Sequence, residues 1–356
     1  MKKARSKGRI ILIILICILI LLTAGWGILT VSIYNENFNK RFTSYEPLML
    51  HVEDFDGLQC EQYEFTSDKG QKLAGYLYSA DSDPHGIIVI AHGLGAGQNS
   101  YMDCADYFAH HGYYVFAYDA TGNDKSEGDG VGGIPQGVAD LDHAVSFVES
   151  RFPELPVALF GHSWGGYSVC AVLSYHPEVR AVIECCGCNR SSDLFEAGGL
   201  DQAGSVIYTM MPFIRLHERI HYGKYAVHTA MDGFAASDAA VMVVHSADDG
   251  VVPIRYCYDV YYEKYKNDPR FVFQHFADRG HNYIFSKTHY LREFYADMNR
   301  WVETLDYDCY AAENAERFRN EKAEYIREHL DREKLTHDLD PELFDGFLAF
   351  YDEHIA

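Results

Sequence analysis

The sequence is short of positive charge, and this shortage excludes one large class of function. Its 356 residues include 30 Lys and Arg against 52 Asp and Glu, which gives a net charge of −22. Few cations are therefore available for phosphate contacts, and binding to nucleic acid is not expected. Internal repeats and low-complexity segments are also lacking. A composition of 48% hydrophobic and 23% charged residues predicts a globular protein with a sizeable core and excludes disorder, collagen and coiled coil.

Cysteine is sparse, and its spacing predicts neither a metal site nor a disulfide framework. Of the nine Cys, three form a cluster at Cys185, Cys186 and Cys188. No second Cys/His pair follows at a finger-like spacing, and the scattered His residues show no metal-ligand spacing. We interpret the cluster as small buried residues at the end of a strand, and we expect no metal and no other cofactor. Disulfides would suit an exported domain, but the spacing identifies no pairs.

A long uncharged run lies near the N-terminus. Residues 10–31 contain no charged residue, and residues 1–9 contain five Lys or Arg and no acid. A helix of 22 residues rises roughly 33 Å, enough to cross the hydrocarbon core of a membrane. The alternatives are a buried core helix, which is rarely apolar on every face, and a cleaved signal peptide. A signal peptide needs a shorter apolar core, whereas this one continues past Thr23-Ala24-Gly25 to Val31, so we favour an uncleaved signal anchor.

The charges around this anchor predict its orientation. Because basic residues stay on the cytoplasmic side, the tail 1–9 is expected in the cytoplasm. The protein is then a single-pass protein of the cell membrane, with everything after Val31 outside the cell. Trp26 and Tyr34 suit the outer membrane interface, and residues 32–57 are expected to form a polar stalk.

Short apolar runs alternate with helical patterns after the stalk. A run such as Gly86–Ala91 is typical of a strand covered on both faces. The alternation predicts an α/β fold with a mostly parallel sheet of about eight strands, flanked by helices, and functional loops at one edge. The expected strands are Leu58–Thr66, Lys72–Ser79, Gly86–Ala91, Tyr113–Tyr118, Val157–Phe160, Ala181–Glu184, Val241–His245 and Phe271–Phe276. The expected helices are Ser100–His111, Gln136–Arg151, Trp164–Tyr175 and Tyr290–Thr304.

Two regions depart from this alternation. More than fifty residues separate the strands near Glu184 and Val241, too many for a structureless loop, and we predict a small helical cap at about 188–236. The main domain is expected at 58–305, followed by an acidic helical extension at 306–356. Its helices are Ala311–Arg332 and Pro341–His354. The second has an apolar stripe that is expected to cover the domain's own surface, with docking of a partner as the alternative.

The sharpest motif lies between an expected strand and an expected helix. Gly161-His162-Ser163-Trp164-Gly165 has the G-x-S-x-G pattern, which in this context is typical of a nucleophilic serine on a tight turn. Side chains at Gly161 or Gly165 would clash in such a turn, and the strain lifts the Ser163 hydroxyl toward solvent. The N-terminus of the following helix favours negative charge there. The alternative is a glycine-rich turn with an incidental serine.

A nucleophilic serine needs a base, and the base needs an orienting acid. In this arrangement the chain order is serine, acid, histidine. His281, in a Gly-His-Asn loop after the last strand, is the predicted base. Asp249, after the strand that ends at His245, is the predicted acid, and its neighbour Asp248 is the rival.

A tetrahedral intermediate also needs backbone N–H donors. The glycine-rich loop Ala91–Gly97 follows a strand and allows close approach of the backbone. We predict the N–H groups of Leu94 and Trp164 as the oxyanion hole. Phosphate binding is the alternative for this loop, but it lacks both the G-K-[ST] and the G-x-G-x-x-G spacing.

Taken together, these motifs resemble the alpha/beta-hydrolase superfamily, in the branch that contains monoacylglycerol lipases, lysophospholipases and proline-type aminopeptidases. The resemblance covers about residues 58–305 and rests on HGLGAG, YDATGNDKSEG, GHSWGG, HSADDGVVP and RGHN. It implies the alpha/beta-hydrolase fold and favours Asp249 over Asp248, because the family's acid lies four residues before a proline, here Pro253. The family often has an Arg-Gly-His turn where this chain has Thr121-Gly122-Asn123.

We therefore expect a serine hydrolase that cleaves a carboxylic ester, with a lipid-like or acyl substrate favoured by the apolar cap and the membrane tether. One alternative is a peptidase of the same fold, in which Asp193, Glu196 or Asp201 would hold the substrate amine. The other is a catalytically silent surface-binding module. The expected partners are a small-molecule ester or lipid and the membrane, and the sequence identifies no protein partner.

Overall fold

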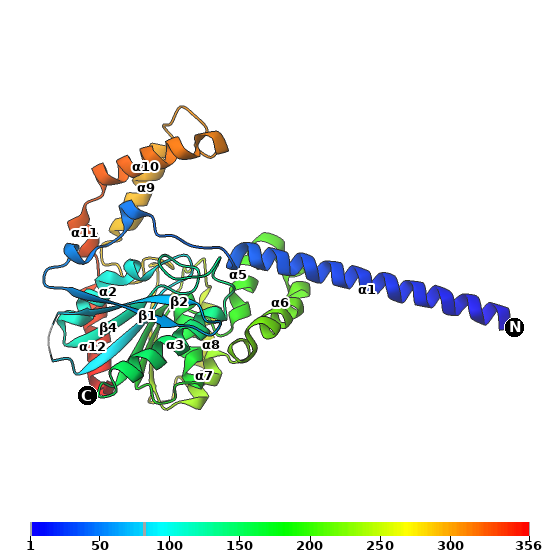
Figure 1. Ribbon diagram of the computed structural model, residues 1–356, viewed down its shortest axis with the longest axis horizontal. Helices are drawn as coiled ribbons and strands as arrows, with labels where there is room; N and C mark the ends of the chain where they lie inside the picture. Colours follow the sequence, from blue (N-terminus) through cyan, green and yellow to red (C-terminus); the bar gives the residue numbers. More distant parts are fainter. Residues whose placement is uncertain (1, 81–82, 356) are drawn as a thin grey trace.

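One eight-stranded sheet forms the centre of the molecule (Figure 1). The structure, a computed structural model, describes residues 2–80 and 83–355, with side chains from Gly8 onward. Most cations of the predicted tail 1–9 therefore lie outside the described side chains. The strand order is β1-β2-β4-β3-β5-β6-β7-β8. The pairs from β4 to β8 are parallel, whereas β2 runs antiparallel to both β1 and β4.

The strands lie where the apolar runs predict them, and each end agrees to within two residues. The α/β prediction with about eight strands is therefore confirmed. The observed strands are β1 (Gln59–Thr66), β2 (Lys72–Ser79), β3 (Gly86–Ala91), β4 (Tyr113–Tyr118), β5 (Val157–His162), β6 (Ala181–Cys185), β7 (Ala240–Ser246) and β8 (Phe271–Phe276).

Two hydrophobic cores cover the two faces of this sheet. Successive side chains of a strand point to opposite faces, so Ile87 and Val89 of β3 enter one core, and Ile88 and Ile90 enter the other. This is why the strands read as continuous apolar runs. The first core is closed by α3 (Gln136–Arg151), α4 (Trp164–Ala171) and α8 (Tyr258–Tyr265), and the second by α2 (Met102–His110) and α12 (Pro341–Ile355).

Helix α8 is the element of the main domain that the sequence analysis did not predict. Its segment is rich in tyrosine and charged residues, which do not form an obvious apolar stripe. Tyr258, Tyr261 and Tyr265 are nevertheless buried, at the spacing i, i+3, i+7 that marks one helix face. Counting tyrosine as a core residue would have revealed this helix.

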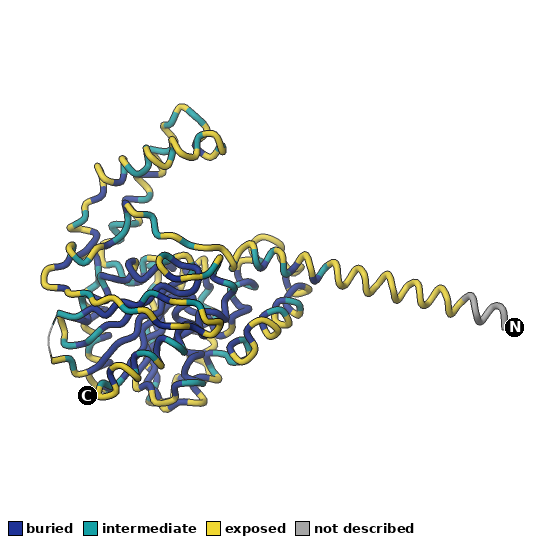
Figure 2. The backbone as a smooth tube through the Cα atoms, viewed as in Figure 1, coloured by how far each residue is buried: buried dark blue, intermediate teal, exposed yellow. Residues whose placement is uncertain are grey.

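The N-terminal run forms one helix, α1 (Lys2–Phe38), and it extends away from the main domain (Figure 1). Within the described residues, it is the one helix long and apolar enough to cross a membrane, with a mean hydropathy of 2.9 over its most apolar window. The large side chains from Ile10 to Leu22 are about half exposed or more, and Figure 2 shows this part of the helix as exposed throughout.

The end of α1 departs from the expected stalk. Residues 32–38 are helical and pack on the cap, and the rest of the segment 32–57 includes the buried side chains Leu50 and Phe55. Tyr34 is fully buried, so its predicted place at the membrane interface is wrong. The physical reason is a buried partner, because the Tyr34 hydroxyl donates a hydrogen bond of 2.7 Å to Glu218.

The predicted cap is present as three helices between β6 and β7: α5 (Ser191–Ala203), α6 (Ile207–Tyr222) and α7 (Ala230–Ala236). Helices α5 and α6 form a small core with the last turns of α1, in which Tyr34 packs against Phe195. The Trp26 indole N–H also donates to the Thr209 hydroxyl at 3.1 Å. The last turns of α1 and the cap are therefore one packed unit.

The C-terminal region divides into an arm and a core helix. Helices α9 (Tyr290–Val302) and α10 (Ala315–His329) form the projecting arm seen in Figure 1, with the Trp301 and Tyr325 rings stacked at 4.5 Å. After α11 (Arg332–Thr336), α12 lies on the sheet, as its apolar stripe predicts. Tyr351 is fully buried, and its hydroxyl donates to the Leu159 carbonyl of β5 at 2.7 Å.

Candidate active site

Ser163 lies on the tight turn between β5 and α4. Its φ of +58° is in the left-handed region, which a residue with a Cβ adopts only when its surroundings enforce it. The crowding is visible in the neighbouring glycines. A Cβ at Gly165 would collide with the Ala91 carbonyl oxygen, and one at Gly161 would collide with the Gly165 carbonyl oxygen. The turn therefore requires glycine on both sides of the serine.

Ser163, His281 and Asp249 form a continuous chain of hydrogen bonds. His281 Nε2 lies 2.8 Å from Ser163 Oγ, and His281 Nδ1 lies 2.7 Å from Asp249 Oδ2. Because an ionised carboxylate only accepts, Nδ1 carries the proton and Nε2 is free to accept from the serine hydroxyl. All three residues are buried, so water competes little for these contacts.

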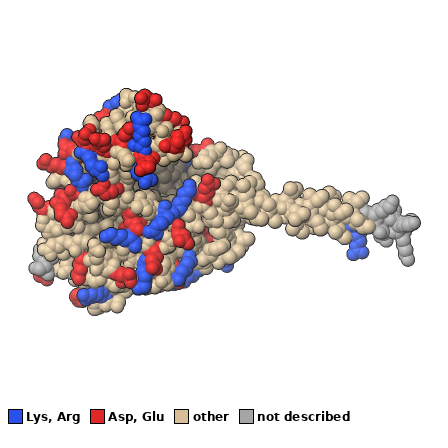
Figure 3. Space-filling view, turned by 45° about the horizontal axis from the view of Figure 1, so that its top comes forward, with Lys and Arg blue, Asp and Glu red and all other residues tan. Residues whose placement is uncertain are grey.

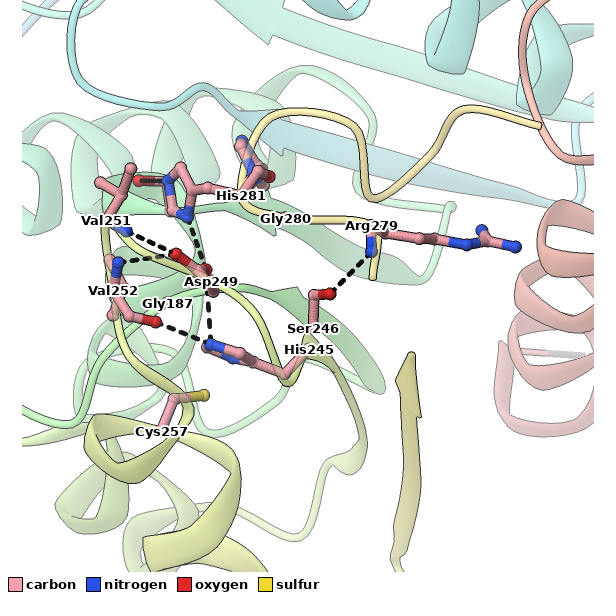
Figure 4. Close-up of polar contacts among 12 residues, drawn as sticks. Gly187, His245, Ser246, Asp249, Val251, Val252, Cys257, Arg279, Gly280 and His281 are labelled. Atoms are coloured by element: carbon pink, nitrogen blue, oxygen red, sulfur yellow. Dashed lines mark hydrogen bonds and ion pairs between the residues drawn. The ribbon is translucent and has the colours of Figure 1, made fainter. Parts of the chain in front are cut away.

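Asp249 is held in place by the backbone around it. Its Oδ1 accepts from the N–H groups of Val251 and Val252, both at 2.8 Å, as Figure 4 shows. His245 lies 3.4 Å from the other oxygen, and its Nε2–H donates to the Val252 carbonyl at 2.9 Å. Burial disfavours the charged carboxylate, but the hydrogen bonds from His281 and from the Val252 N–H outweigh it, and the pKa of Asp249 lies below its usual value. The group is therefore ionised at neutral pH.

The rival acid, Asp248, makes a different set of contacts. It is exposed, and its Oδ1 accepts from the Ser246 hydroxyl at 2.6 Å and from the Gly280 N–H at 2.8 Å. It thus ties the loop after β7 to the loop that carries His281. The structure brings Asp249, and not Asp248, to the imidazole ring.

Two residues that the sequence analysis missed hold His281 from the other side. His162 donates from Nε2 to the His281 carbonyl at 3.0 Å, and its Nδ1 accepts from the Tyr101 hydroxyl at 2.8 Å. That hydroxyl in turn accepts from the Gly93 N–H at 3.0 Å. Burial, assisted by the nearby His281, lowers the pKa of His162 to about 3, so the ring stays neutral. His162 is the second residue of the G-x-S-x-G motif, but the motif accepts any residue there, so it did not predict this role.

The two predicted oxyanion donors lie beside the serine. Trp164 is the first residue of α4, so its backbone N–H has no acceptor within its own helix. Leu94 lines the same cavity as Ser163, on the loop after β3. This cavity has a volume of about 450 Å³ and is also lined by Phe38 of α1 and by Leu194 and Gly198 of α5.

The C-terminal segment reaches the loop of His281 through Arg279. The guanidinium of Arg279 pairs with Asp340, just before α12, and donates to the Ile284 carbonyl at 3.1 Å. It also lies over the Phe276 ring, 3.6 Å from the centroid, while the Arg279 N–H donates to Ser246 (Figure 4). The position of His281 thus depends on contacts from outside the region 58–305.

Among the residues that the structure describes, three clusters of side chains have the spacing to hold a metal ion. Two of them, built around Cys186, share His281 or Asp249 with the site described above. Both ring nitrogens of His281 already contact Ser163 or Asp249. A metal ion bound to His281 would therefore have to break one of these two contacts. The third, Glu149, His176 and Glu178, lies elsewhere.

The parallel sheet, the serine turn after β5 and the acid and histidine loops after β7 and β8 define the alpha/beta-hydrolase fold of serine hydrolases. An esterase of known structure from Pyrococcus furiosus shares this fold, with a TM-score of 0.55 and 15% sequence identity. The superposition covers 75% of this chain and 97% of the esterase. At this identity the likeness concerns the fold alone.

Sequence comparison adds relatives for the first part of the domain. Residues 82–221 match the family model described as serine aminopeptidase, S33. A monoacylglycerol lipase of Mycolicibacterium smegmatis is 30% identical over 118 residues, which are 33% of this chain and 42% of the lipase. A monoglyceride lipase of Rattus norvegicus is 34% identical over 99 residues, 27% of this chain and 33% of that protein. The matches span less than half of these relatives, and they support an esterase-like or lipase-like hydrolase.

Proposed function

We propose that this protein is a serine hydrolase that cleaves carboxylic esters with a lipid-like acyl group. The observation that carries the proposal is the unbroken chain from Ser163 Oγ through His281 to Asp249, with hydrogen bonds of 2.8 and 2.7 Å, at the wall of a cavity. A serine, a neutral imidazole and an ionised acid in this order are the parts that an acyl-enzyme mechanism needs.

The mechanism has two steps. Ser163 Oγ attacks the ester carbonyl and passes its proton to His281 Nε2, while the N–H groups of Trp164 and Leu94 stabilise the oxyanion. The imidazolium gives this proton to the leaving alcohol, which leaves an acyl ester on Ser163. A water molecule, deprotonated by His281, then attacks the acyl group and releases the carboxylic acid, and the proton returns to the serine. Asp249 stabilises the imidazolium in both steps without taking a proton.

The lining of the cavity favours an ester over a peptide with a free amine. An aminopeptidase needs an acid to hold the substrate amine, and among the described residues the cavity is lined by no Asp or Glu. The candidates for that role have other contacts. Asp193 accepts from the Arg190 N–H at 2.9 Å, Glu196 accepts from the Tyr256 hydroxyl at 3.2 Å, and Asp201 is exposed.

We also propose that α1 anchors the protein in the cell membrane as an uncleaved single-pass helix, with the N-terminus cytoplasmic and the hydrolase domain outside. The exposed apolar side chains from Ile10 to Leu22 support the span. The packing of Trp26 and Tyr34 against the cap supports retention of the helix in the mature protein.

The test uses the full chain in detergent micelles with a fluorophosphonate probe and p-nitrophenyl butyrate. We expect the probe to label the wild type and not Ser163→Ala. Asp249→Asn should lower kcat/KM about 10⁴-fold, because the imidazole loses its orienting acceptor. The matched variant Asp248→Asn removes a charge that does not contact His281 and keeps an oxygen that can accept both loop hydrogen bonds, so it should lower kcat/KM less than about tenfold.

Two outcomes would contradict the proposal. If the folded wild type were neither labelled nor active on the ester, the silent binding module would replace the hydrolase. If Asp248→Asn lost as much activity as Asp249→Asn, with both variants folded by thermal unfolding, the assignment of the acid would be wrong.

A further inference from the structure

A second cavity lies beside the catalytic one, between α1 and the cap. It has a volume of about 170 Å³ and is lined by side chains of α1, α5 and α6. Phe38, Leu194 and Gly198 line both cavities, so the slot directly adjoins the cavity that Ser163 lines. We call this second cavity the anchor slot.

The anchor slot is apolar. Its described lining residues are apolar or glycine except for Asn37 and Gln202. On the cap side, Phe195 and Met210 are each 5% exposed and form an apolar wall. The opposite wall is Ile33 of α1. Such a surface favours an alkyl chain and offers little to a charged or sugar-like group.

The wall contributed by α1 is fixed rather than loosely apposed. The Tyr34 hydroxyl donates to Glu218 at 2.7 Å and accepts from the Ile134 N–H at 3.0 Å. Glycine at position 27 also allows α1 to approach α6 closely, because a Cβ there would lie 2.8 Å from the Phe213 ring. The slot is therefore a feature of the folded chain, with one side made by the helix that is proposed to span the membrane.

The cap also has the surface expected of a part that lies next to lipid. Tyr208, Leu216 and Ile220 of α6 are more than half exposed. Residues 188–236 contain four basic and five acidic residues, whereas the whole chain has a net charge of −22. Figure 3 shows the charged side chains on the body of the molecule and a largely uncharged surface beside α1. A near-neutral cap with exposed apolar side chains can lie against a bilayer with less desolvation of charged groups than the acidic body of the molecule.

We propose that the membrane helix is part of the substrate site: the acyl chain of a single-chain membrane ester lies in the anchor slot, against Ile33 and Phe38 of α1, with its carbonyl carbon at Ser163. The alkyl chain moves from the bilayer along α1 into the slot without crossing water, where each exposed CH₂ group would be unfavourable. The small polar alcohol then lies in the larger cavity. This inference rests on the proposed ester hydrolase activity and adds to it the source of the substrate and the helix that selects it.

The experiment compares two esters with the full chain in phosphatidylcholine vesicles, p-nitrophenyl palmitate and p-nitrophenyl butyrate. The readout is the ratio of kcat/KM for palmitate to that for butyrate, which cancels differences in the amount of folded protein. Ile33→Phe fills the slot from the α1 side, and we expect the ratio to fall at least about tenfold, the equivalent of losing roughly two buried CH₂ groups. Gly198→Phe, on the cap wall, should lower it as well. The control Leu29→Phe adds the same ring to an exposed position of α1 outside the slot, and should leave the ratio unchanged.

The outcomes separate this inference from the proposed function. A wild type that hydrolyses butyrate but not palmitate, or an unchanged ratio in both slot variants, would overturn the inference and leave the hydrolase intact. An equal fall in Ile33→Phe and Leu29→Phe would also overturn it, because the effect would then come from α1 in general. If the wild type hydrolysed neither ester and the probe did not label Ser163, the proposed hydrolase activity itself would be wrong.

Discussion

The two ends of the chain both lie outside the region that resembles known hydrolases, and both contact that region, but they do so by different means. The C-terminal helix α12 packs in the second of the two cores of the sheet, with Phe344 and Phe347 fully buried. The N-terminal helix α1 meets mainly the cap, through a small core around Tyr34 and a hydrogen bond to the buried carboxyl group of Glu218. It also contacts the main domain, because the Ile134 N–H donates to the Tyr34 hydroxyl.

This difference indicates different roles for the two segments. A helix with several fully buried aromatic rings contributes mainly to the stability of the whole domain, because burial of apolar surface is the dominant favourable term in folding. Helix α1 packs mainly on the cap and not on the sheet, so it acts mainly on the cavities that it lines. Three substitutions test this contrast.

The largest effect is expected for Phe344→Ala in α12. This fully buried ring lies against Phe108 and Phe160, so its removal should lower the free energy of unfolding by about 3–5 kcal/mol. The measurement is denaturant unfolding of the full chain in detergent. Phe318→Ala, a half-buried ring on the arm helix α10, is the control and should lower it by less than half as much. Equal effects of the two changes would show that α12 is no more important to the core than the arm.

A smaller effect is expected for Tyr34→Phe in α1. The change removes one hydroxyl and leaves both Glu218 and the Ile134 N–H short of a partner, which should destabilise the junction by about 1–3 kcal/mol. Hydrogen exchange should show faster opening of α5 and α6, with the central strands unaffected. Ser191→Ala is the control, since it removes a hydrogen bond to the same carboxyl group from within the cap. If protection from exchange were lost over the whole sheet, the inference that α1 stabilises the cap and not the sheet would be wrong.

The smallest effect is a change in pH dependence in Glu218→Gln. Burial raises the pKa of Glu218 to about 7, although the hydroxyl groups of Ser191 and Tyr34 oppose this shift. The folded protein therefore holds a proton that the unfolded chain releases near pH 4.5, so the stability from this group is present at low pH and is lost as the pH rises through about 7. Arg215 and Asp193 also face this carboxyl group, and they remain in the variant.

The measurement is the difference in unfolding free energy between wild type and Glu218→Gln from pH 4.5 to pH 8. As the pH rises, the wild type should lose stability relative to Glu218→Gln by at most about 1.4 kcal/mol per pH unit, and the difference should level off above pH 7. A difference that did not vary with pH would mean that the Glu218 carboxyl group is already ionised in the folded protein.

The central sheet and the candidate site residues Ser163, Asp249 and His281 could be predicted from the sequence because their signals are local. An apolar run between turn residues identifies a strand such as β3, and strand–Gly-x-Ser-x-Gly–helix identifies Ser163 from fewer than twenty residues. The parallel topology then brings the loops with Asp249 and His281 to the same edge, although they lie 86 and 118 residues from the serine in sequence.

The contacts of the two termini do not follow from the sequence because their signals are spread over the whole chain. Tyr34 reads as an interfacial aromatic until Glu218, 184 residues later, is found beside it. Arg279 and Asp340 are ordinary charged residues until the fold pairs them. The neutral ring of His162 is likewise defined by Tyr101 and by a backbone carbonyl, neither of which a sequence pattern records.

The place of α12 on the sheet has a consequence for how fast the protein can fold. Its Tyr351 hydroxyl donates to the Leu159 carbonyl of β5, and these two residues are 192 positions apart in the sequence. Tyr34 of α1 and its partner Glu218 of α6 are 184 positions apart. A contact between such distant residues forms only after a long loop has closed, and this loop closure slows folding. Both the core of the sheet and the small core of the cap are completed by contacts of this kind, so we expect the domain to fold slowly.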